Sequence, residues 1–389
     1  MFEVDVKLGI YANWNIFLSD GGFYVEGIHK KYLDQFVKKT EQVTLLCSSS
    51  RNHDIPENFE FVSTQDVKLI QLPDFNSYLG ALKKSHSIWN GMKELLSVSD
   101  FVYLRTPEPF SWFAAILKKD QVLNYHFTSN PLEVLRGRMK DDFLKNLFKI
   151  LIFYPEYFLI SLSAYFNFCS ANGSSVLKNV PFFIRKKIDV LVESSILSTD
   201  EFSSPNLLPN ESFNFICVSR LQEGKGLELL IEAFSELKKE NASQSFSLSI
   251  VGNGPTLESL VCLTKKLHIE GDVKFLGFIP NGPKLNQVYQ EHNIFVNPSI
   301  SETGPRTLIE ALYNNLYCIS TDVGYVRDVI DGNDSLGVLV EPNCKKALEA
   351  SLKSVVQNFD LSDINNINRR NLIEGYTLDS FISNVLKKG

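Results

Sequence analysis

The sequence predicts an α/β protein built from two doubly wound domains, each with a mainly parallel sheet. Short apolar strands alternate with longer segments of helical period along the whole chain, which is typical of parallel α/β units. The length of 389 residues exceeds what one hydrophobic core usually organises. Residues 194–212, SSILSTDEFSSPNLLPNES, are rich in Ser, Pro and Asn without any period, which indicates a linker.

These features give the expected domain bounds. Residues 1–195 form the first domain and residues 196–375 the second. Residues 376–389 form a C-terminal helix that could return to the first domain. Ligands of such sheets bind beyond the carboxyl ends of the strands, so we expect a binding cleft where the two domains face each other.

Apolar runs place the strands, in order along the chain. In the first domain we expect them near 6–11, 43–47, 67–72, 101–104, 122–126, 166–170 and 188–193. In the second domain we expect them near 213–218, 246–251, 273–276, 294–297, 317–321 and 336–340. Between the latter, apolar residues three and four positions apart predict helices in LELLIEAFSELKKE, TLESLVCLTKKL and KKALEASLKSVVQNF.

Composition excludes several classes of function. The net charge is −6 and no long basic run occurs, which argues against a nucleic-acid partner and favours small molecules. The six cysteines are scattered without zinc-ligand spacing, so we expect buried reduced thiols and no metal. The N-terminus, MFEVDVKLGIYANW, lacks the pattern of a secretory signal, and we expect a cytoplasmic protein.

Residues 143–166, FLKNLFKILIFYPEYFLISLSAYF, approach the length of a membrane span. Two lysines and the Pro155–Glu156 pair interrupt the segment, so we expect two shorter, partly buried helices. The alternative is a face on the membrane surface, because five cations could meet anionic headgroups. They are Arg136, Arg138, Lys140, Lys145 and Lys149.

The stretch SETGPRTLIEAL, residues 301–312, follows a buried strand and carries two glutamates eight positions apart, Glu302 and Glu310. Pro305 suits the first position of a helix, and the free N–H groups of a helix start attract anions. A phosphorylated ligand fits this arrangement, with its phosphate at the helix start and its hydroxyl groups bound by the carboxylates.

Two cations occupy a glycine-flanked loop, VSRLQEGKG, at the end of the first strand of the second domain. Arg220 and Lys225 lie five residues apart there, and both could reach a diphosphate at the same edge of the sheet. Such groups neutralise the charge that develops on a departing diphosphate.

Five spaced motifs of the second half resemble the nucleotide-sugar-binding domain of family 4 retaining glycosyltransferases with the GT-B fold. They are VSRLQEGKG, IVGNGP, VKFLGFIP, FVNPSISETGPRTLIEAL and STDVGYVRDVI, within residues 213–342. The first half matches only in a Gly-Gly loop after its first strand and a histidine at a strand end. The resemblance implies two Rossmann-like domains that face each other across a cleft.

The resemblance also implies roles for residues of the second domain. Arg220 and Lys225 would hold the donor diphosphate, Glu302 the hydroxyls of the transferred sugar, and Glu310 the ribose. The loop at Phe278 and Ile279 would hold the base. The implied donor set also includes Gly252, Asn253, Thr303 and Gly304.

In the first domain the resemblance is looser and implies three residues. His126 would face the reacting sugar, and Gly21 and Gly22 would let their loop approach the donor phosphate or the acceptor. The family often has Glu-Gly-Phe-Gly where this chain has Glu302 to Pro305. Proline has no backbone N–H, so Pro305 cannot donate a hydrogen bond to the donor sugar or phosphate, and the Thr303 hydroxyl would donate one instead. Because no Asp-x-Asp follows a strand, the cations would do the work of a metal.

The implied function is that of a retaining, metal-independent hexosyltransferase (EC 2.4) without a cofactor. Its donor is a UDP- or GDP-linked sugar, and its acceptor is a saccharide or lipid-linked saccharide in cell-surface polysaccharide synthesis, O-antigen or capsule. Peripheral contact with the inner membrane surface agrees with such an acceptor. The alternatives are a soluble small-molecule acceptor or a non-catalytic nucleotide-sugar-binding subunit. A nucleotide-sugar epimerase fits less well, and no GxGxxG supports a dinucleotide oxidoreductase.

Overall fold

The computed structural model describes residues 5–50, 55–75, 77–129, 143–198, 212–241, 244–358 and 367–387. It divides the chain into two compact units. The first unit comprises Met1–Leu191 and Leu378–Gly389, and the second unit comprises Val192–Thr377. Most of the predicted linker, residues 199–211, lies outside the described residues.

Seven parallel strands form the main sheet of the first unit, in the spatial order β6-β4-β1-β7-β8-β9-β10. Their bounds are β1 Lys7–Tyr11, β4 Gln42–Ser50, β6 Val67–Leu72, β7 Phe101–Thr106, β8 Val122–Phe127, β9 Phe168–Asn172 and β10 Asp189–Leu191. Each lies where an apolar run predicts a strand. The chain order reverses beside β1, as in other doubly wound folds.

A small antiparallel sheet, which the sequence analysis missed, extends the first unit. It consists of β2 Ile16–Ser19, β3 Gly22–Glu26 and β5 Phe59–Ser63, and β2 joins it to the end of β4. The SDGGF segment is therefore the turn of a hairpin: Asp20 and Gly21 connect the paired Ser19 and Gly22, and Gly21 has φ 75°. Alternation is hard to see in strands this short, which explains the omission.

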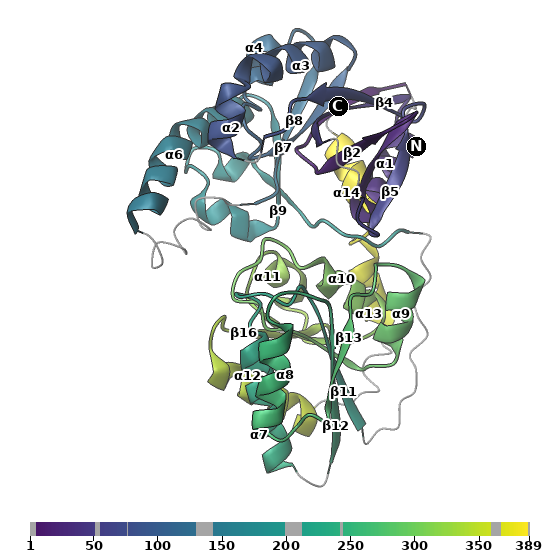
Figure 1. Cartoon of the computed structure of the whole chain (residues 1–389), viewed down its shortest axis with the longest axis vertical. Coiled ribbons are helices and arrows are strands. Elements are labelled where there is room, and N and C mark those ends of the chain that lie inside the picture. The colour runs from purple at the N-terminus through teal and green to yellow at the C-terminus, as the bar shows by residue number, and fades with distance from the viewer. Residues whose placement is uncertain are drawn as a thin grey trace. The chain divides into compact units, whose positions relative to one another are not determined.

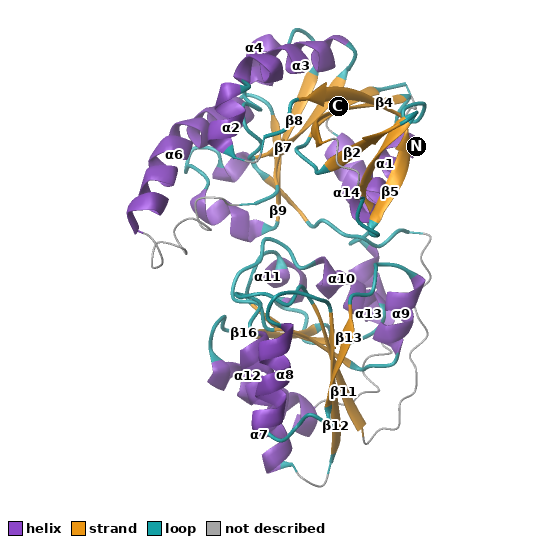
Figure 2. Ribbon diagram, viewed as in Figure 1, coloured by secondary structure: helices purple, strands orange, loops and turns teal. Residues whose placement is uncertain are grey.

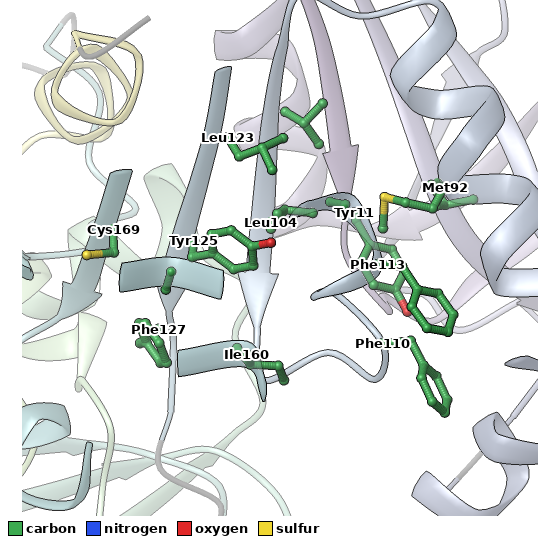
Figure 3. Packing of buried hydrophobic residues seen from close by; sticks show 14 of the residues in the cluster. Tyr11, Met92, Leu104, Phe110, Phe113, Leu123, Tyr125, Phe127, Ile160 and Cys169 are labelled. Carbon is green, nitrogen blue, oxygen red and sulfur yellow. The ribbon is translucent and has the colours of Figure 1, made fainter. Parts of the chain in front are cut away.

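Helices cover both faces of the main sheet, as Figure 1 shows. They are α1 Gly27–Lys39, α2 Tyr78–Lys83, α3 Ser85–Ser97, α4 Phe113–Leu117, α6 Phe143–Tyr165 and α14 Leu378–Leu386. Alternate residues of β8 show the two faces. Leu123, Tyr125 and Phe127 pack into the core with α3, α4 and α6 (Figure 3). Asn124 and His126 contact α14 instead.

Residues 143–165 form one continuous helix, so the prediction of two shorter helices is wrong. Pro155 lies inside α6. The next residue, Glu156, is buried and accepts hydrogen bonds from Phe110 N, Trp112 Nε1 and Tyr78 Oη. These contacts hold the helix on its unit at the point where proline removes a backbone donor.

Six parallel strands form the sheet of the second unit, in the order β13-β12-β11-β14-β15-β16. Figure 2 draws the strands in orange and the helices in purple. They are β11 Ser212–Val218, β12 Ser245–Val251, β13 Val273–Gly277, β14 Ile294–Asn297, β15 Tyr317–Thr321 and β16 Gly337–Val340. The helices are α7 Leu227–Glu240, α8 Leu257–Lys266, α9 Pro283–Gln290, α10 Arg306–Tyr313, α11 Val326–Ile330, α12 Lys345–Asn358 and α13 Ile367–Glu374. The strand order is that of a Rossmann fold, and every strand predicted here is present.

The last helix, α14, belongs to the first unit although the second unit precedes it in the chain. Phe381 makes edge-on contacts with the rings of Tyr32 and His126. The backbone oxygen of Val385 accepts a hydrogen bond from Asn124 Nδ2 at 3.0 Å. The C-terminal helix thereby completes one face of the first sheet.

Candidate active site

Two loops of the second unit meet at the carboxyl ends of the neighbouring strands β11 and β14. The N–H of Ile300 donates a hydrogen bond of 2.9 Å to the oxygen of Gly224. Gly226 has φ 66°, and a Cβ atom there would lie 2.0 Å from the oxygen of Pro298. Only glycine permits this approach, so the sequence EGKG fixes how closely the Arg220–Lys225 loop lies to the SETG loop.

The approach brings Lys225 and Glu302 together. Lys225 Nζ forms an ion pair with Glu302 Oε1, and Ser299 Oγ donates to the same oxygen at 3.3 Å. The exposed fractions of the two side chains are 12% and 21%. A partly buried cation beside a carboxylate is suited to a ligand that carries both phosphate and hydroxyl groups.

Arg220 lies on the same loop but is exposed to solvent. Below the loop, burial raises the pKa of the Cys217 thiol to about 12. This cysteine therefore remains protonated at neutral pH and does not act as a nucleophile.

Glu310 has a different environment, within the buried part of α10. It is 4% exposed. Its Oε1 accepts hydrogen bonds from Ser195 Oγ at 2.5 Å and Asn281 Nδ2 at 2.7 Å, and its Oε2 accepts one from Tyr289 Oη at 3.2 Å. Burial, followed by the Glu310 charge, raises the pKa of Tyr289 well above its usual value, so this hydroxyl is a permanent donor.

The sequence analysis missed the three residues that hold Glu310. Ser195 lies in the predicted linker, Asn281 in a loop and Tyr289 in a helix, separated from Glu310 by 115, 29 and 21 positions. No local pattern connects such residues, since only the folded chain brings them to one carboxylate.

Helix α10 begins at Arg306, one residue later than predicted. Pro305 is its N-cap, with φ −74° and an extended ψ of 93°. The first N–H groups of a helix have no acceptor within the helix and make its start attractive to anions. The loop before α10 packs closely against Gly324. A Cβ atom at Gly324 would lie 2.6 Å from the carbonyl carbon of Thr303.

Loops from β12 and β13 extend the same edge of the sheet. The oxygen of Asn253 accepts a hydrogen bond of 2.9 Å from Leu221 N, and Gly252 N donates to Gly277 O at 2.8 Å. Phe278 is 61% exposed, whereas Ile279 is partly buried. The structure thus gathers the predicted donor residues of the second unit beyond the carboxyl ends of β11, β12, β13 and β14, on four loops and, for Glu310, on helix α10.

The other three predicted site residues, His126, Gly21 and Gly22, belong to the first unit. His126 is fully buried between the rings of Tyr103 and Phe381, and its Nδ1 lies 2.9 Å from Ser170 Oγ. Gly21 lies in the hairpin turn between β2 and β3, and Gly22 is the first residue of β3 and pairs with Ser19. The fold accounts for each position by packing or turn geometry, and their contacts with substrate stay predictions.

A polar pocket that the sequence did not indicate lies at the carboxyl ends of β1, β4, β6 and β7 in the first unit. Its volume is about 470 Å³. The polar side chains that line it come from Asn13, Asn15, Ser48, Asp74, Ser77 and Tyr78. These amides, hydroxyls and one carboxylate, with no lysine or arginine among the described lining residues, are suited to an uncharged, hydroxyl-rich ligand.

Glu108 lies beside this pocket, next to Pro109 in the chain. Burial raises the pKa of its carboxyl to about 7, although the backbone N–H of Asn13 and the charge of Arg105 oppose the change. In the part of the chain that the structure describes, no group of three His, Cys, Asp or Glu side chains could hold a metal ion.

Residues 198–371 match the family described as glycosyl transferases group 1. Among curated proteins, the chain is similar to the N-acetylgalactosamine-N,N'-diacetylbacillosaminyl-diphospho-undecaprenol 4-alpha-N-acetylgalactosaminyltransferase of Campylobacter jejuni. The identity is 26% over 264 residues, which cover 67% of each chain. It is also 26% identical over 145 residues to the gpi3 subunit of the phosphatidylinositol N-acetylglucosaminyltransferase of Schizosaccharomyces pombe, covering 37% of this chain and 31% of that protein.

Among solved structures, the lipopolysaccharide outer core galactosyltransferase WaaB in its apo form has a TM-score of 0.67 at 17% identity. The similarity covers 98% of this chain and 99% of that one. At this identity the likeness shows the fold alone, and it confirms the GT-B fold that the sequence motifs predict.

Proposed function

We propose that this chain, whose residues 198–371 match the glycosyl transferases group 1 family, is a glycosyltransferase that moves a hexosyl residue from a UDP- or GDP-linked sugar to a saccharide acceptor with retention of configuration. The observation that carries the proposal is the Lys225–Glu302 contact at the carboxyl ends of β11 and β14. This contact places Lys225, which would bind the diphosphate, beside Glu302, which would accept hydrogen bonds from the sugar hydroxyls.

The donor is held by the second unit. Lys225 and Arg220 bind the diphosphate, and the start of α10 adds backbone N–H groups and the positive end of its dipole. Glu310 binds the ribose hydroxyls, and the loop at Phe278 and Ile279 contacts the base. No metal or cofactor is needed in this scheme, because the two cations stabilise the leaving diphosphate.

The acceptor is held by the first unit, at the polar pocket beyond β1, β4, β6 and β7. The name of the Campylobacter relative specifies an acceptor linked to diphospho-undecaprenol, and that of the Schizosaccharomyces relative specifies phosphatidylinositol. These names support a lipid-linked saccharide acceptor for this chain in polysaccharide or glycolipid synthesis, with peripheral contact between the protein and a membrane.

The reaction proceeds on one face of the sugar. The bond between the anomeric carbon and the diphosphate oxygen breaks, and the acceptor oxygen bonds to the same face. The proton of the acceptor hydroxyl moves to the departing phosphate. Leaving-group stabilisation by Lys225, Arg220 and the start of α10 makes this route feasible without a nucleophilic side chain on the opposite face.

The first experiment is NMR of the anomeric proton of the product from an α-linked donor. We expect an α-linked product, and a β-linked product would overturn the mechanism. The same assay in EDTA should retain full rate, because the side chains replace a metal. An absolute requirement for Mg²⁺ or Mn²⁺ would refute this part of the proposal.

The second experiment removes the cation. Lys225→Ala should lower kcat/KM by about thirtyfold or more, equivalent to about 2 kcal/mol of transition-state stabilisation. The matched control is Lys265→Ala, an exposed lysine on α8 of the same unit, which should transfer sugar at the wild-type rate. Unchanged turnover in Lys225→Ala would exclude its role at the diphosphate.

A further inference from the structure

Helix α6 has two apolar faces, and only one of them packs on the first unit. The apolar residues of the buried face are Tyr157, Ile160 and Ala164, and Glu156 and Ser161 are buried beside them. The opposite face carries large apolar side chains every three or four residues, all exposed: Phe148, Leu151, Tyr154, Phe158, Leu162 and Tyr165. A soluble helix normally has polar residues on its outer face, so this pattern marks an interaction surface.

The exposed face continues beyond the end of the helix. Phe166 is 71% exposed, and Phe182, in the turn before β10, is 84% exposed. Phe183 connects the two segments, because its ring contacts those of Phe158, Tyr165 and Phe182. We call the outer residues of α6 together with Phe166 and Phe182 the aromatic face.

Cations border this face. Residues 143–188 contain six lysines and arginines and one acidic residue, Glu156, which is buried. Lys149, Lys178, Arg185, Lys186 and Lys187 are exposed. Lys187 Nζ lies 5.3 Å from the centre of the Tyr165 ring, at the edge of the aromatic face. This local excess of positive charge stands out in a chain with a net charge of −6.

The contacts of α6 exclude a spanning helix in this fold. By length and composition, Leu147–Tyr165 is the one candidate span among the described residues. However, Glu156 holds Phe110, Trp112 and Tyr78 through hydrogen bonds near the middle of that stretch. Insertion across a bilayer would break these bonds and expose the core. Pairing with a second copy through the same face would bring like charges together.

We propose that the aromatic face is a docking surface for a bilayer that contains anionic phospholipids. The aromatic side chains enter the interfacial region, and the bordering lysines and arginine bind the headgroups. The inference rests on the proposed function for its biological sense, since it brings the enzyme to a lipid-linked acceptor. Its test does not depend on that function.

The test is co-sedimentation of the full chain with vesicles of phosphatidylcholine alone, or of phosphatidylcholine and phosphatidylglycerol in equal parts. We expect binding mainly to the anionic vesicles. The double variant Phe166→Ser, Phe182→Ser should weaken this binding by about tenfold or more, as should Lys178→Glu combined with Lys186→Glu. Because these side chains are exposed, the variants should fold normally.

Matched controls are Ile116→Ser, which is 60% exposed on α4 of the same unit, and Lys265→Glu on α8. Both should bind vesicles as the wild type does. Absence of wild-type binding, or equal binding by the aromatic-face variants, would overturn the proposal. Sedimentation velocity that shows a dimer lost in the phenylalanine variants would assign the face to a second copy instead. Transfer to a soluble acceptor is measured in parallel: loss of vesicle binding with normal transfer refutes only the docking surface.

Discussion

The two glutamates of SETGPRTLIEAL differ in burial and partners, in the way that their proposed substrate roles require. Glu302 is partly exposed and pairs with Lys225. In the proposed function, an incoming diphosphate would compete for the lysine and leave the carboxylate to the sugar. Glu310 is buried and is fixed by Ser195, Asn281 and Tyr289. A fixed acceptor loses little conformational entropy on binding a ribose.

Substitution should therefore separate the two glutamates. We expect Glu310→Gln to weaken binding of the free nucleoside diphosphate by about 1.5–3 kcal/mol, because a charged acceptor is lost. Glu302→Gln should leave that affinity unchanged and lower the rate of transfer. Titration calorimetry with UDP and GDP measures the first effect and initial rates the second. Equal losses of nucleotide affinity in both variants would contradict this division.

Glu108 should make the stability of the first unit depend on pH. Burial raises its pKa to about 7 in the folded protein, above the value of about 4.3 expected for an unfolded chain. The folded state therefore binds this proton more tightly than the unfolded chain does. The resulting stabilisation of the fold is full below about pH 4 and is lost as the pH rises through 7.

We expect Glu108→Gln to match the wild type in unfolding free energy at pH 4 and to exceed it at pH 8 by about 1–2 kcal/mol. Thermal scans at the two pH values test this difference. If the stability of the variant differs from that of the wild type by the same amount at both pH values, the carboxyl does not titrate in this range.

At the scale of elements, α6 is anchored by one buried carboxylate. Three donors from α2 and from the turn before α4 converge on Glu156, and burial raises the pKa of this carboxyl. Because these donors come from segments far from α6 in the sequence, the anchor determines where the aromatic face is presented.

Glu156→Ala should lower the free energy of unfolding by about 2–4 kcal/mol, because buried donors lose their acceptor. Glu156→Gln should lose less, since its amide oxygen still accepts. Urea denaturation followed by tryptophan fluorescence suits the measurement, because the three tryptophans, Trp14, Trp89 and Trp112, all lie in the first unit. Equal stability of Glu156→Ala and the wild type would exclude the anchoring role.

At the scale of the whole molecule, the chain leaves the first unit, forms the second and returns as α14. Phe381 is 2% exposed and packs on Tyr32 and His126. The stability of the first unit thus depends on residues that follow the second unit in the sequence.

We expect Phe381→Ala to destabilise the first unit by about 3–5 kcal/mol through the cavity it leaves. Phe166→Ala, on the exposed aromatic face, should change stability by less than about 0.5 kcal/mol. Tryptophan fluorescence in urea reports both, and the affinity of the second unit for UDP or GDP should stay unchanged. A stable Phe381→Ala variant would mean that α14 adds little to this core.

Local pattern determined much of the fold. Every strand of both parallel sheets lies where an apolar run predicted it, because strands buried on both faces are almost continuously apolar. Helix α7 begins at Leu227, directly after the glycine-containing loop, and follows its apolar period. The hairpin of β2 and β3 and the continuity of α6 were not predictable in this way, since each depends on contacts with distant residues.

The candidate site likewise has features that local sequence determines and features that only tertiary contacts determine. The sequence by itself determined the parallel sheets and the resemblance to glycosyltransferases, and it gave the candidate donor residues, because motifs at strand ends are local and are read directly from residue type and spacing. Only the tertiary structure decided that Lys225 contacts Glu302 and that three distant side chains bind Glu310. In the first unit, it alone decided that His126 is buried against α14 and that the outer face of α6 is apolar. These facts depend on which side chains the folded backbone brings within hydrogen-bond or van der Waals distance. The spacing of residues in the sequence does not predict such contacts.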